Sequence, residues 1–368
     1  MRIKFNTTGR GKCYYIIRSV YRNGKNTSEI VEKLGYEDEI REQHHCDDAI
    51  AWIKQHLKEL NAKEEASRKV LVPFDAAALI TPGEQQSFNI GYLFLQRIWY
   101  QLKLDLICSA VRKKYKLPFD LNGILSRCVF RQILFPSSAL STARFTKDFP
   151  EQTEFEYADV SRALPVLSRE MDFIEKEVYR NIRRILTRPT SVLFHFSMPS
   201  SPVPMDLILD EDALPLAMDI HPENQKEPQS FHAVITNLPE DEMDTVLATL
   251  REGREISDFF GIRKQAFREG SAEVSQEERT KAHFLVCFLA LLVLRILKKE
   301  LGGNCTEEEI TDTLRKMRVT RIKDVGYIPA YTRTKLTDRL HDLAGFRTDY
   351  EIIREKAMRG ILRKSRQR

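Results

Sequence analysis

Hydrophobic residues at the start of the chain follow the pattern of β-strands. Residues 14–21 are β-branched and aromatic for most of their length, and residues 27–34 can supply a return strand. Between them, Asn23-Gly24 is a strong signal for a tight hairpin turn, because both residues tolerate positive φ. The pattern therefore predicts a β-hairpin within residues 1–36.

Helical spacing dominates the next part of the chain. Residues 37–66 carry apolar positions three and four apart, with Asp47 or Asp48 as the predicted N-cap. Residues 88–187 read as all-helical. The helices predicted there cover residues 91–104, 106–115, 121–134, 136–149, 159–169 and 172–185.

The hydrophobic period then changes from that of helices to that of strands. Four strands are predicted, as a three-stranded meander plus one more, at residues 191–196, 206–210, 214–220 and 231–236. Helical spacing returns at 255–267 and in the very apolar stretch 282–301, and Thr306 to Glu309 is a capping-box start. A loop or strand at 325–332 precedes two helices, at 333–343 and 349–364.

These elements predict an α+β fold of four domains. They are a hairpin plus helix (1–66), a helical domain (67–188), a small sheet flanked by helices (189–301), and a C-terminal helical region with a basic tail (302–368). A length of 368 residues suits several domains, and 42% apolar residues are enough for a real core.

Membrane and secreted proteins are disfavoured by three further features. The stretch 282–301 contains an interrupting Arg295, so it predicts a buried core helix rather than a membrane span. The six cysteines are scattered, without a Cys-x-x-Cys pair, which favours reduced thiols and a cytoplasmic location. The first residues show no apolar signal segment.

Charge is informative in its distribution rather than its total. Lys and Arg number 58 and Asp and Glu 53, a formal net charge of +5. Within the first 28 residues, however, there are cations and no acidic residue. A basic ribbon can lie along phosphates or enter a DNA groove, although a solvated ribbon also needs charge. We take as candidate DNA contacts Arg10, Lys12, Arg18, Arg22 and Lys25.

Two readings of the helical domain remain open. Short helices joined by tight turns, with Arg127, Arg131, Arg144 and Lys147 among them, are compatible with helix-turn-helix geometry. An ordinary helical bundle fits the same pattern. A second basic stripe, Arg180 to Arg188, and the acid-free tail from Arg359 to Arg368 would add positive charge in either case.

Short motifs spread along the chain resemble bacterial insertion-sequence transposases of the IS-four superfamily, in the branch that opens with a basic hairpin. The motifs follow the family order. They are Tyr14 to Ile17, Asn23 to Lys25, Val31 to Gly35, Gly91 to Gln96, Ile133 to Ser138, Leu214 to Ala217, Ala282 to Phe288, Tyr327 to Arg333 and Gly345 to Tyr350.

The resemblance implies a DDE transposase. Such enzymes have an RNase H-like core in which three carboxylates hold two Mg²⁺ ions for phosphoryl transfer. It implies that residues 67–188 are a DNA-binding domain and 189–301 the core. The partner implied is double-stranded DNA, including the inverted-repeat ends of the element, in the nucleoid of a bacterial cytoplasm.

This chain departs from the family pattern at all three carboxylates. Phe196 stands at the position of the first Asp, and the segment that would carry the second is missing between Glu227 and Thr236. The third belongs to a Tyr-x2-Arg-x3-Glu-x6-Lys signature, of which only the final Lys is kept, as Lys264. We therefore expect an internally deleted core with no catalytic residue, no metal site and no cofactor, and add Lys264 to the candidate DNA contacts.

Two alternatives are left open. An active Mg²⁺-dependent enzyme could use displaced carboxylates such as Asp219, Glu255 or Asp258, in which case Mg²⁺ would be its cofactor. A non-enzymatic protein could instead self-associate, for example as a homodimer, through an apolar helix 282–301 exposed by the deletion. Asp206 and Asp210 share one strand face, but Asp210 to Asp212 are explained more simply as a hairpin turn.

Overall fold

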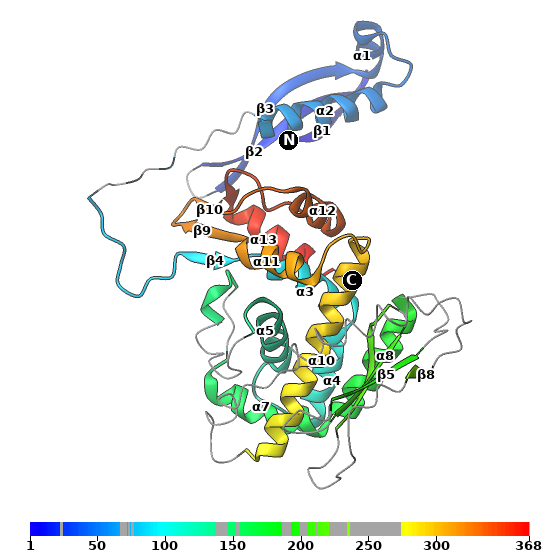
Figure 1. Cartoon of the computed structure of the whole chain (residues 1–368). Helices are drawn as coiled ribbons and strands as arrows, with labels where there is room; N and C mark the ends of the chain where they lie inside the picture. Colours follow the sequence, from blue (N-terminus) through cyan, green and yellow to red (C-terminus); the bar gives the residue numbers. More distant parts are fainter. Residues whose placement is uncertain are drawn as a thin grey trace. The chain divides into compact units, whose positions relative to one another are not determined.

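The fold is mixed α+β and divides into two compact units, Met1–Leu79 and Ile80–Arg368 (Figure 1). The computed structural model describes residues 1–22, 25–66, 72, 74, 77–136, 146–151, 155–185, 193–198, 205–210, 212–220, 234–235 and 274–367. The predicted helix at 255–267, most of that at 136–149 and the Asn23-Gly24 turn lie outside these residues.

The N-terminal unit begins with a three-stranded antiparallel sheet in the order β1-β2-β3. Its strands are β1 (Arg2–Thr8), β2 (Gly11–Arg22) and β3 (Lys25–Tyr36). The predicted hairpin is confirmed as β2 and β3. Strand β1 was not predicted; it turns into β2 through Gly9 and Arg10, where Gly11 takes a positive φ of 125° that suits glycine.

Two helices complete this unit, α1 (Glu37–His44) and α2 (Ala49–Ala66). The predicted cap is confirmed at Asp48, whose Oδ1 accepts the backbone N–H groups of Ile50 (2.8 Å) and Ala51 (3.1 Å). A small core holds the helices to the sheet. It consists of Tyr14, Ile16, Leu34, Ile40, Ala49 and Ile53.

The C-terminal unit contains the predicted helices close to their expected bounds. They are α3 (Tyr92–Gln101), α4 (Leu104–Tyr115), α5 (Leu121–Leu134), α7 (Tyr157–Arg169) and α8 (Met171–Ile185). Of the helix predicted at 136–149, the described residues contain only the short η1 (Thr146–Asp148).

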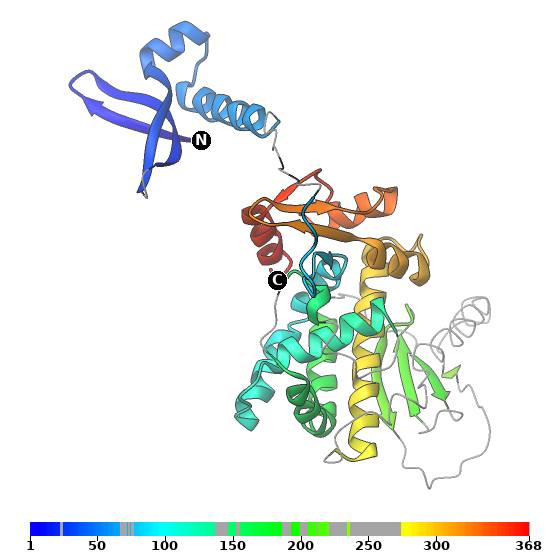
Figure 2. The same ribbon diagram turned by 90° about the vertical axis from the view of Figure 1, so that its left-hand side faces the viewer.

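The apolar stretch forms the long helix α10 (Gln276–Glu300), which begins at a capping box between Ser275 and Glu278. By length and composition it could cross a membrane, but 89% of its most apolar window is buried inside the protein. Figure 2 shows it between the other helices and a small sheet. The prediction of a buried core helix is confirmed, so the helix has no broad apolar face left for self-association.

The small sheet confirms the predicted meander plus one strand. It runs antiparallel in the order β7-β6-β5-β8, built from β5 (Leu193–Met198), β6 (Met205–Asp210), β7 (Pro215–Ile220) and β8 (Val234–Ile235). Burial alternates along most of β6, where Met205, Leu207 and Leu209 face the core.

A second four-stranded sheet in this unit was not predicted. Its order is β11-β10-β9-β4, from β4 (Ser87–Asn89), β9 (Arg318–Ile322), β10 (Gly326–Pro329) and β11 (Ile353–Arg354). Three helices accompany it, α11 (Glu307–Lys316), α12 (Lys335–Ala344) and α13 (Glu355–Lys364). The predicted capping box is confirmed, because Glu309 N–H donates to Thr306 Oγ1 at 3.1 Å.

A close junction joins the two ends of this unit. The buried Asn89 amide donates to the carbonyl oxygens of Leu314 (2.9 Å) and Arg315 (3.1 Å) at the end of α11, and Asn89 Oδ1 accepts the backbone N–H of Tyr92 at the start of α3 (3.2 Å). One side chain thus satisfies unpaired groups at two helix ends. Gly91 lies so close to the Leu314 carbonyl that a Cβ would overlap it.

One hydrophobic core runs through the whole C-terminal unit, from Phe88 to Ile361. It includes Trp99 of α3, Leu207 of β6, Phe288 of α10 and Met358 of α13. The three segments that the sequence predicts as the helical, sheet and C-terminal domains therefore share a single core.

Candidate nucleic-acid interface

The N-terminal sheet has one face against the helices and one face without them. Side chains alternate between faces along a strand, and the residues that pack on the helices set the register. Ile16 and Tyr14 of β2 belong to the core, while Glu32 of β3 pairs with His56 of α2 at 2.9 Å. Arg18, two residues from Ile16, lies on the same side and pairs with Glu64 at 3.6 Å.

Cross-strand pairing then defines the open face. Lys4 is opposite Tyr15, and Tyr15 is opposite Lys33; in the next layer Arg2 is opposite Ile17, and Ile17 is opposite Ile30. Residues directly opposite each other share a face. We call these six residues the open-face patch: Arg2, Lys4, Tyr15, Ile17, Ile30 and Lys33.

The open-face patch is basic and partly apolar. Its three cations are exposed, and Ile30 is 61% exposed although it is a large hydrophobic residue, whereas Tyr15 is half-buried and Ile17 is buried beneath its neighbours. At the described strand positions of this face there is no Asp or Glu, because Glu29 and Glu32 point to the helix side with their partners Arg18 and Ile16. The charge of the patch is therefore not neutralised within the sheet.

The candidate cations predicted from the sequence do not gather in one place. Arg10 lies in the β1–β2 turn and pairs with Asp38 (3.2 Å) and Glu39 (3.0 Å), and the hydrogen bond to Asp38 raises its pKa. Lys12 lies on the helix side with its Nζ 5.0 Å from the centre of the Phe5 ring. Arg18 pairs with Glu64, as described above. Strand alternation and local acids thus separate these three residues, and their contact with DNA stays a prediction.

The other candidate contacts cannot be placed. The backbones of Arg22 and Lys25 end β2 and begin β3, but their side chains lie outside the described residues, as does Lys264. The residues that the candidate list missed are Arg2, Lys4 and Lys33. Alternation within β1 could have put Arg2 and Lys4 on one face, whereas Lys33 depends on the irregularity in the β2–β3 register between Ile16 and Ile17, which no sequence signal marks.

The helix-turn-helix reading of Arg127 is also wrong. This side chain is 3% exposed, donates to Glu151 at 3.1 Å, and lies over the rings of Phe149 and Tyr92. Burial lowers the pKa of Arg131, which is half-buried. Lys147 is exposed, and Arg144 lies outside the described residues. The bundle interpretation fits these side chains better than a DNA-reading surface.

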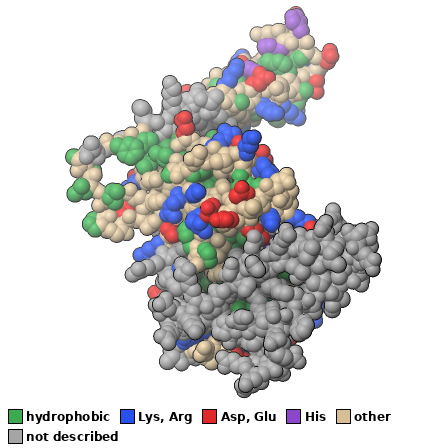
Figure 3. All heavy atoms as spheres, in the orientation of Figure 1, with side chains coloured by type: hydrophobic (Ala, Val, Ile, Leu, Met, Phe, Trp, Pro, Cys, Tyr) green, Lys and Arg blue, Asp and Glu red, His purple; other side chains and the backbone are tan. Residues whose placement is uncertain are grey.

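Other cations of this unit are mixed with acids. On the face shown in Figure 3, basic and acidic side chains are interspersed over the described surface. Arg180 of α8 pairs with Glu177, and Arg366 of the basic tail pairs with Glu151 at 2.5 Å. Arg183, Arg184, Arg359 and Arg363 are exposed. Arg180 and Arg366 are thus paired with acids, so they do not form an acid-free surface like the open-face patch.

Carboxylates on the small sheet do not converge into a metal site among the described residues. Asp206 and Asp219 are opposite each other on β6 and β7. Asp210 Oδ1 accepts the backbone N–H groups of Asp212 (3.0 Å) and Leu214 (2.8 Å), so the predicted role of Asp210 in the hairpin turn is confirmed. Glu255 and Asp258 lie outside the described residues.

Glu175 of α8 is a buried acid that lies against the edge strand β7 of this sheet. Its side chain is 8% exposed and its Oε2 accepts the backbone N–H of Met218 on the edge strand β7 at 3.2 Å. Burial raises the pKa of Glu175 to about 8, with added repulsion from Asp172 and Asp219. The carboxyl is therefore largely protonated at neutral pH and serves the fold rather than a metal.

Glu175 makes stability depend on pH. A carboxyl whose pKa is higher in the folded state than in the unfolded chain stabilises the fold below pH 4.5, and that contribution is lost as pH rises to about 8. We expect Glu175→Gln, which keeps the acceptor for Met218 N–H, to be more stable than wild type at pH 8 by on the order of 2–4 kcal/mol. Urea unfolding at pH 5 and pH 8 measures this; equal pH dependence in both proteins would contradict it.

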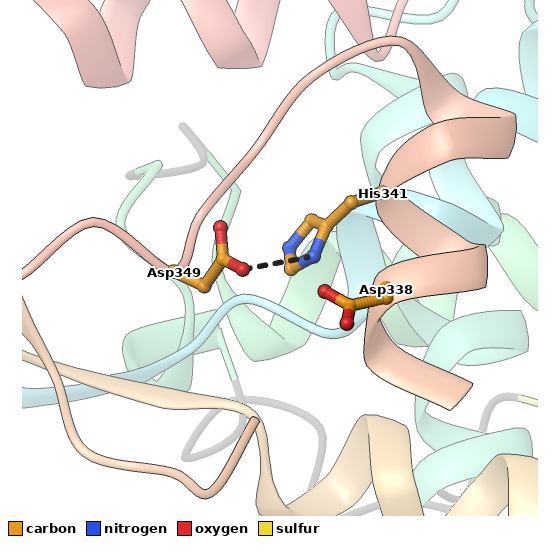
Figure 4. Close-up of side chains that lie close together, drawn as sticks. All are labelled: Asp338, His341 and Asp349. Carbon is orange, nitrogen blue, oxygen red and sulfur yellow. Dashed lines mark ion pairs between the residues drawn. The ribbon is translucent and has the colours of Figure 1, made fainter. Parts of the chain in front are cut away.

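One cluster of the described residues has ligand types at metal distance, namely Asp338 and His341 on α12 and Asp349 in the following loop (Figure 4). His341 is fully buried, with its Nδ1 3.7 Å from Asp349 Oδ2. The spacing of Asp338 and His341 puts both on one helix face.

Two observations show that this cluster does not fit a metal. Arg347 donates to Asp349 (2.6 Å) and to Asp338 (2.8 Å), and Arg333 pairs with Asp338 (2.7 Å), so two guanidinium groups already neutralise the two carboxylates. The backbone N–H of Thr348 donates to His341 Nε2 at 3.1 Å, which makes Nε2 an acceptor and leaves the hydrogen on Nδ1. The nitrogen that faces the carboxylates is therefore a donor, and the cluster is a structural network.

Comparison with protein-family models, with curated proteins and with solved structures finds no match to this chain. The candidate function consequently rests on the residues and geometry described above.

Proposed function

We propose that this chain is a double-stranded DNA-binding protein of the insertion-sequence transposase type, that it binds DNA through the open-face patch of its N-terminal unit, and that it does not cleave the DNA it binds. The observation that carries the proposal is an exposed sheet face with Arg2, Lys4 and Lys33 and no carboxylate at its described strand positions.

The spacing of these cations suits a phosphate backbone. Arg2 and Lys4 are two residues apart on one strand, hence roughly 7 Å apart along it. Double-stranded DNA carries one charge per about 1.7 Å of its axis, so several phosphates lie within reach of such a face. Contacts of this kind position a protein on DNA without reading its sequence.

The rest of the patch adds apolar contact. Tyr15 lies between Lys4 and Lys33 in the cross-strand register, and the exposed Ile30 flanks it. A ring beside two cations can pack on sugar and base surfaces while the cations hold the phosphates. The sheet beneath is fixed by the core with α1 and α2, so the patch is preorganised.

The absence of cleavage follows from the sequence resemblance. The position of the first family carboxylate carries Phe196, the segment of the second is missing, and the signature of the third keeps only Lys264. Without three converging carboxylates, the two Mg²⁺ ions that the reaction requires have no set of protein ligands to hold them. The protein would then bind transposon DNA, including the inverted-repeat ends, without cutting it.

A titration of duplex DNA at two salt concentrations tests the binding. Three phosphate contacts predict a slope of log K against log salt near −2.7, or about a 40-fold loss of affinity between 50 and 200 mM salt. The measurement is a gel shift, or fluorescence anisotropy, with the full chain and a labelled duplex.

Two further arms complete the design. Adding Mg²⁺ or Mn²⁺ should leave the labelled duplex intact; metal-dependent nicking that Asp219→Ala abolishes would favour the active-enzyme alternative. Affinity that is independent of salt, or no binding to any duplex, would contradict the proposed function.

A further inference from the structure

We propose that a cavity in the C-terminal unit binds a small phosphate ester of about nucleotide size. The cavity has a volume of about 470 Å³ and lies between α3, the start of α5 and Arg366 near the end of the chain. Small-molecule sites range from about 300 to 1,000 Å³. The space therefore suits an organic molecule better than a lone ion.

The first sign of a missing ligand is Arg127, which lines the cavity. The residue is 97% buried, and while its Nη2 donates to Glu151, its Nη1 has no hydrogen-bond partner among the described residues. A buried guanidinium nitrogen without an acceptor is costly, and such a group in a folded protein calls for a specific explanation. The guanidinium packs over the rings of Tyr92 and Phe149, and an anion in the cavity that Arg127 lines would place a negative charge beside it.

The charges around the cavity favour an anion. Three guanidinium groups line it, those of Arg112, Arg127 and Arg366, against the carboxylates of Asp120 and Glu151. Glu151 is already engaged, because it accepts from Arg127, from Arg366 and, at 3.1 Å, from the Tyr92 hydroxyl. The three guanidinium groups and the two carboxylates together leave the cavity with one net positive charge.

The neutral lining supplies further donors. The Trp99 ring N–H donates to Asn122 Oδ1 at 2.9 Å, which fixes the amide, and the Asn122 side chain also hydrogen-bonds to Tyr100, so one Nδ2 hydrogen is left for another acceptor. Asn122 lies in the first turn of the 14-residue helix α5, whose start has no side-chain cap from Asp120. Backbone N–H groups at such a start attract anions.

These features together point to a phosphate ester. Guanidinium groups bind phosphate oxygens in pairs, and several donors around one cavity match the several acceptors of a phosphate. The walls formed by Tyr100 and Phe119 give the organic part an aromatic boundary. The ester could come from a free nucleotide or from the end of a nucleic-acid strand, and both present the same chemistry.

Calorimetric titration of the full chain tests the site with three probes: adenosine 5′-monophosphate, citrate, and a 5′-phosphorylated eight-residue oligothymidylate. We expect saturable binding of the monophosphate, weakened at least tenfold by Arg112→Gln and by Arg127→Gln. Arg112 is exposed and makes one long hydrogen bond of 3.4 Å, so its replacement should leave the fold intact even if Arg127→Gln does not fold. The matched control is Arg321→Gln, in an exposed ion pair outside the cavity.

The probes separate the outcomes. Binding of the oligonucleotide alone, weakened by Arg112→Gln and unaffected by Lys4→Gln, would support the site with the strand end as its ligand. Citrate binding as tight as that of the monophosphate would overturn the phosphate class. Absence of binding by both phosphate probes, or binding that Arg112→Gln leaves unchanged, would overturn the site without touching the proposed DNA binding.

Discussion

Replacing Arg2, Lys4 and Lys33 together by Gln is expected to weaken duplex DNA binding by on the order of 100-fold at 0.15 M salt. Each lost phosphate contact removes about 0.9 from the slope of log K against log salt, so three contacts remove about 2.7. The same variant should therefore show a nearly flat salt dependence. The side chains are exposed, so thermal unfolding should change little.

The matched control removes the same total charge from the other cations of the sheet. Arg10→Gln, Lys12→Gln and Arg18→Gln together should weaken binding less than about fivefold, because two of these cations are ion-paired and Lys12 faces the helix side. Both triple variants lose the same net charge, so the general attraction that net charge provides is reduced in both. Equal losses of affinity would mean that no particular face of the sheet binds DNA.

Gly91→Ala is expected to destabilise the C-terminal unit by about 3 kcal/mol or more. A Cβ at this position would overlap the backbone carbonyl of Leu314, and a backbone atom at a helix end cannot move aside like a flexible side chain. Relief requires shifting α3 from α11, which would break the Asn89 hydrogen bonds that join them. Urea unfolding followed by circular dichroism measures the change.

Gly360→Ala is the control for the chemistry of the substitution. Gly360 lies within α13, and no atom comes near the position of an added Cβ. Alanine there should stabilise the protein by about 0.5–1 kcal/mol through its higher helix propensity. If both variants lost stability to the same extent, the close contact at Gly91 would not be the cause.

Local patterns account for most of the helices and for the small sheet. The helical period of residues 121–134 and 172–185 gave α5 and α8 nearly to the residue, and Thr306 with Glu309 marked the start of α11. Such elements are fixed by neighbours in the sequence, namely capping residues and one apolar face. Sequence reasoning succeeds where the interactions that decide an element lie within it.

Elements fixed by distant partners were not predictable. Strand β4 has three residues, and it is a strand because it pairs with β9 more than two hundred positions later. The cations show the same limit. Arg127 resembles a DNA contact in the sequence and is buried on Glu151, whereas Lys33 joins Lys4 only through Tyr15 and an irregular register. The alternation of side chains along a strand predicts which residues share a face of the sheet, but it does not predict which face the helices cover.

The pairing of β4 with β9 also sets an order of events during synthesis. The first strand of the C-terminal unit cannot find its partner until residue 322 has left the ribosome, and long-range pairings of this kind form slowly. The apolar helix α10 emerges earlier and can pack on α3, α5 and α7, which precede it in the chain, so strand β4 rather than this helix waits for its partner. Shortened chains that stop before β9 should therefore leave β4 without its partner strand, and an unpaired strand edge favours aggregation, which makes the last fifty residues decisive for the whole product.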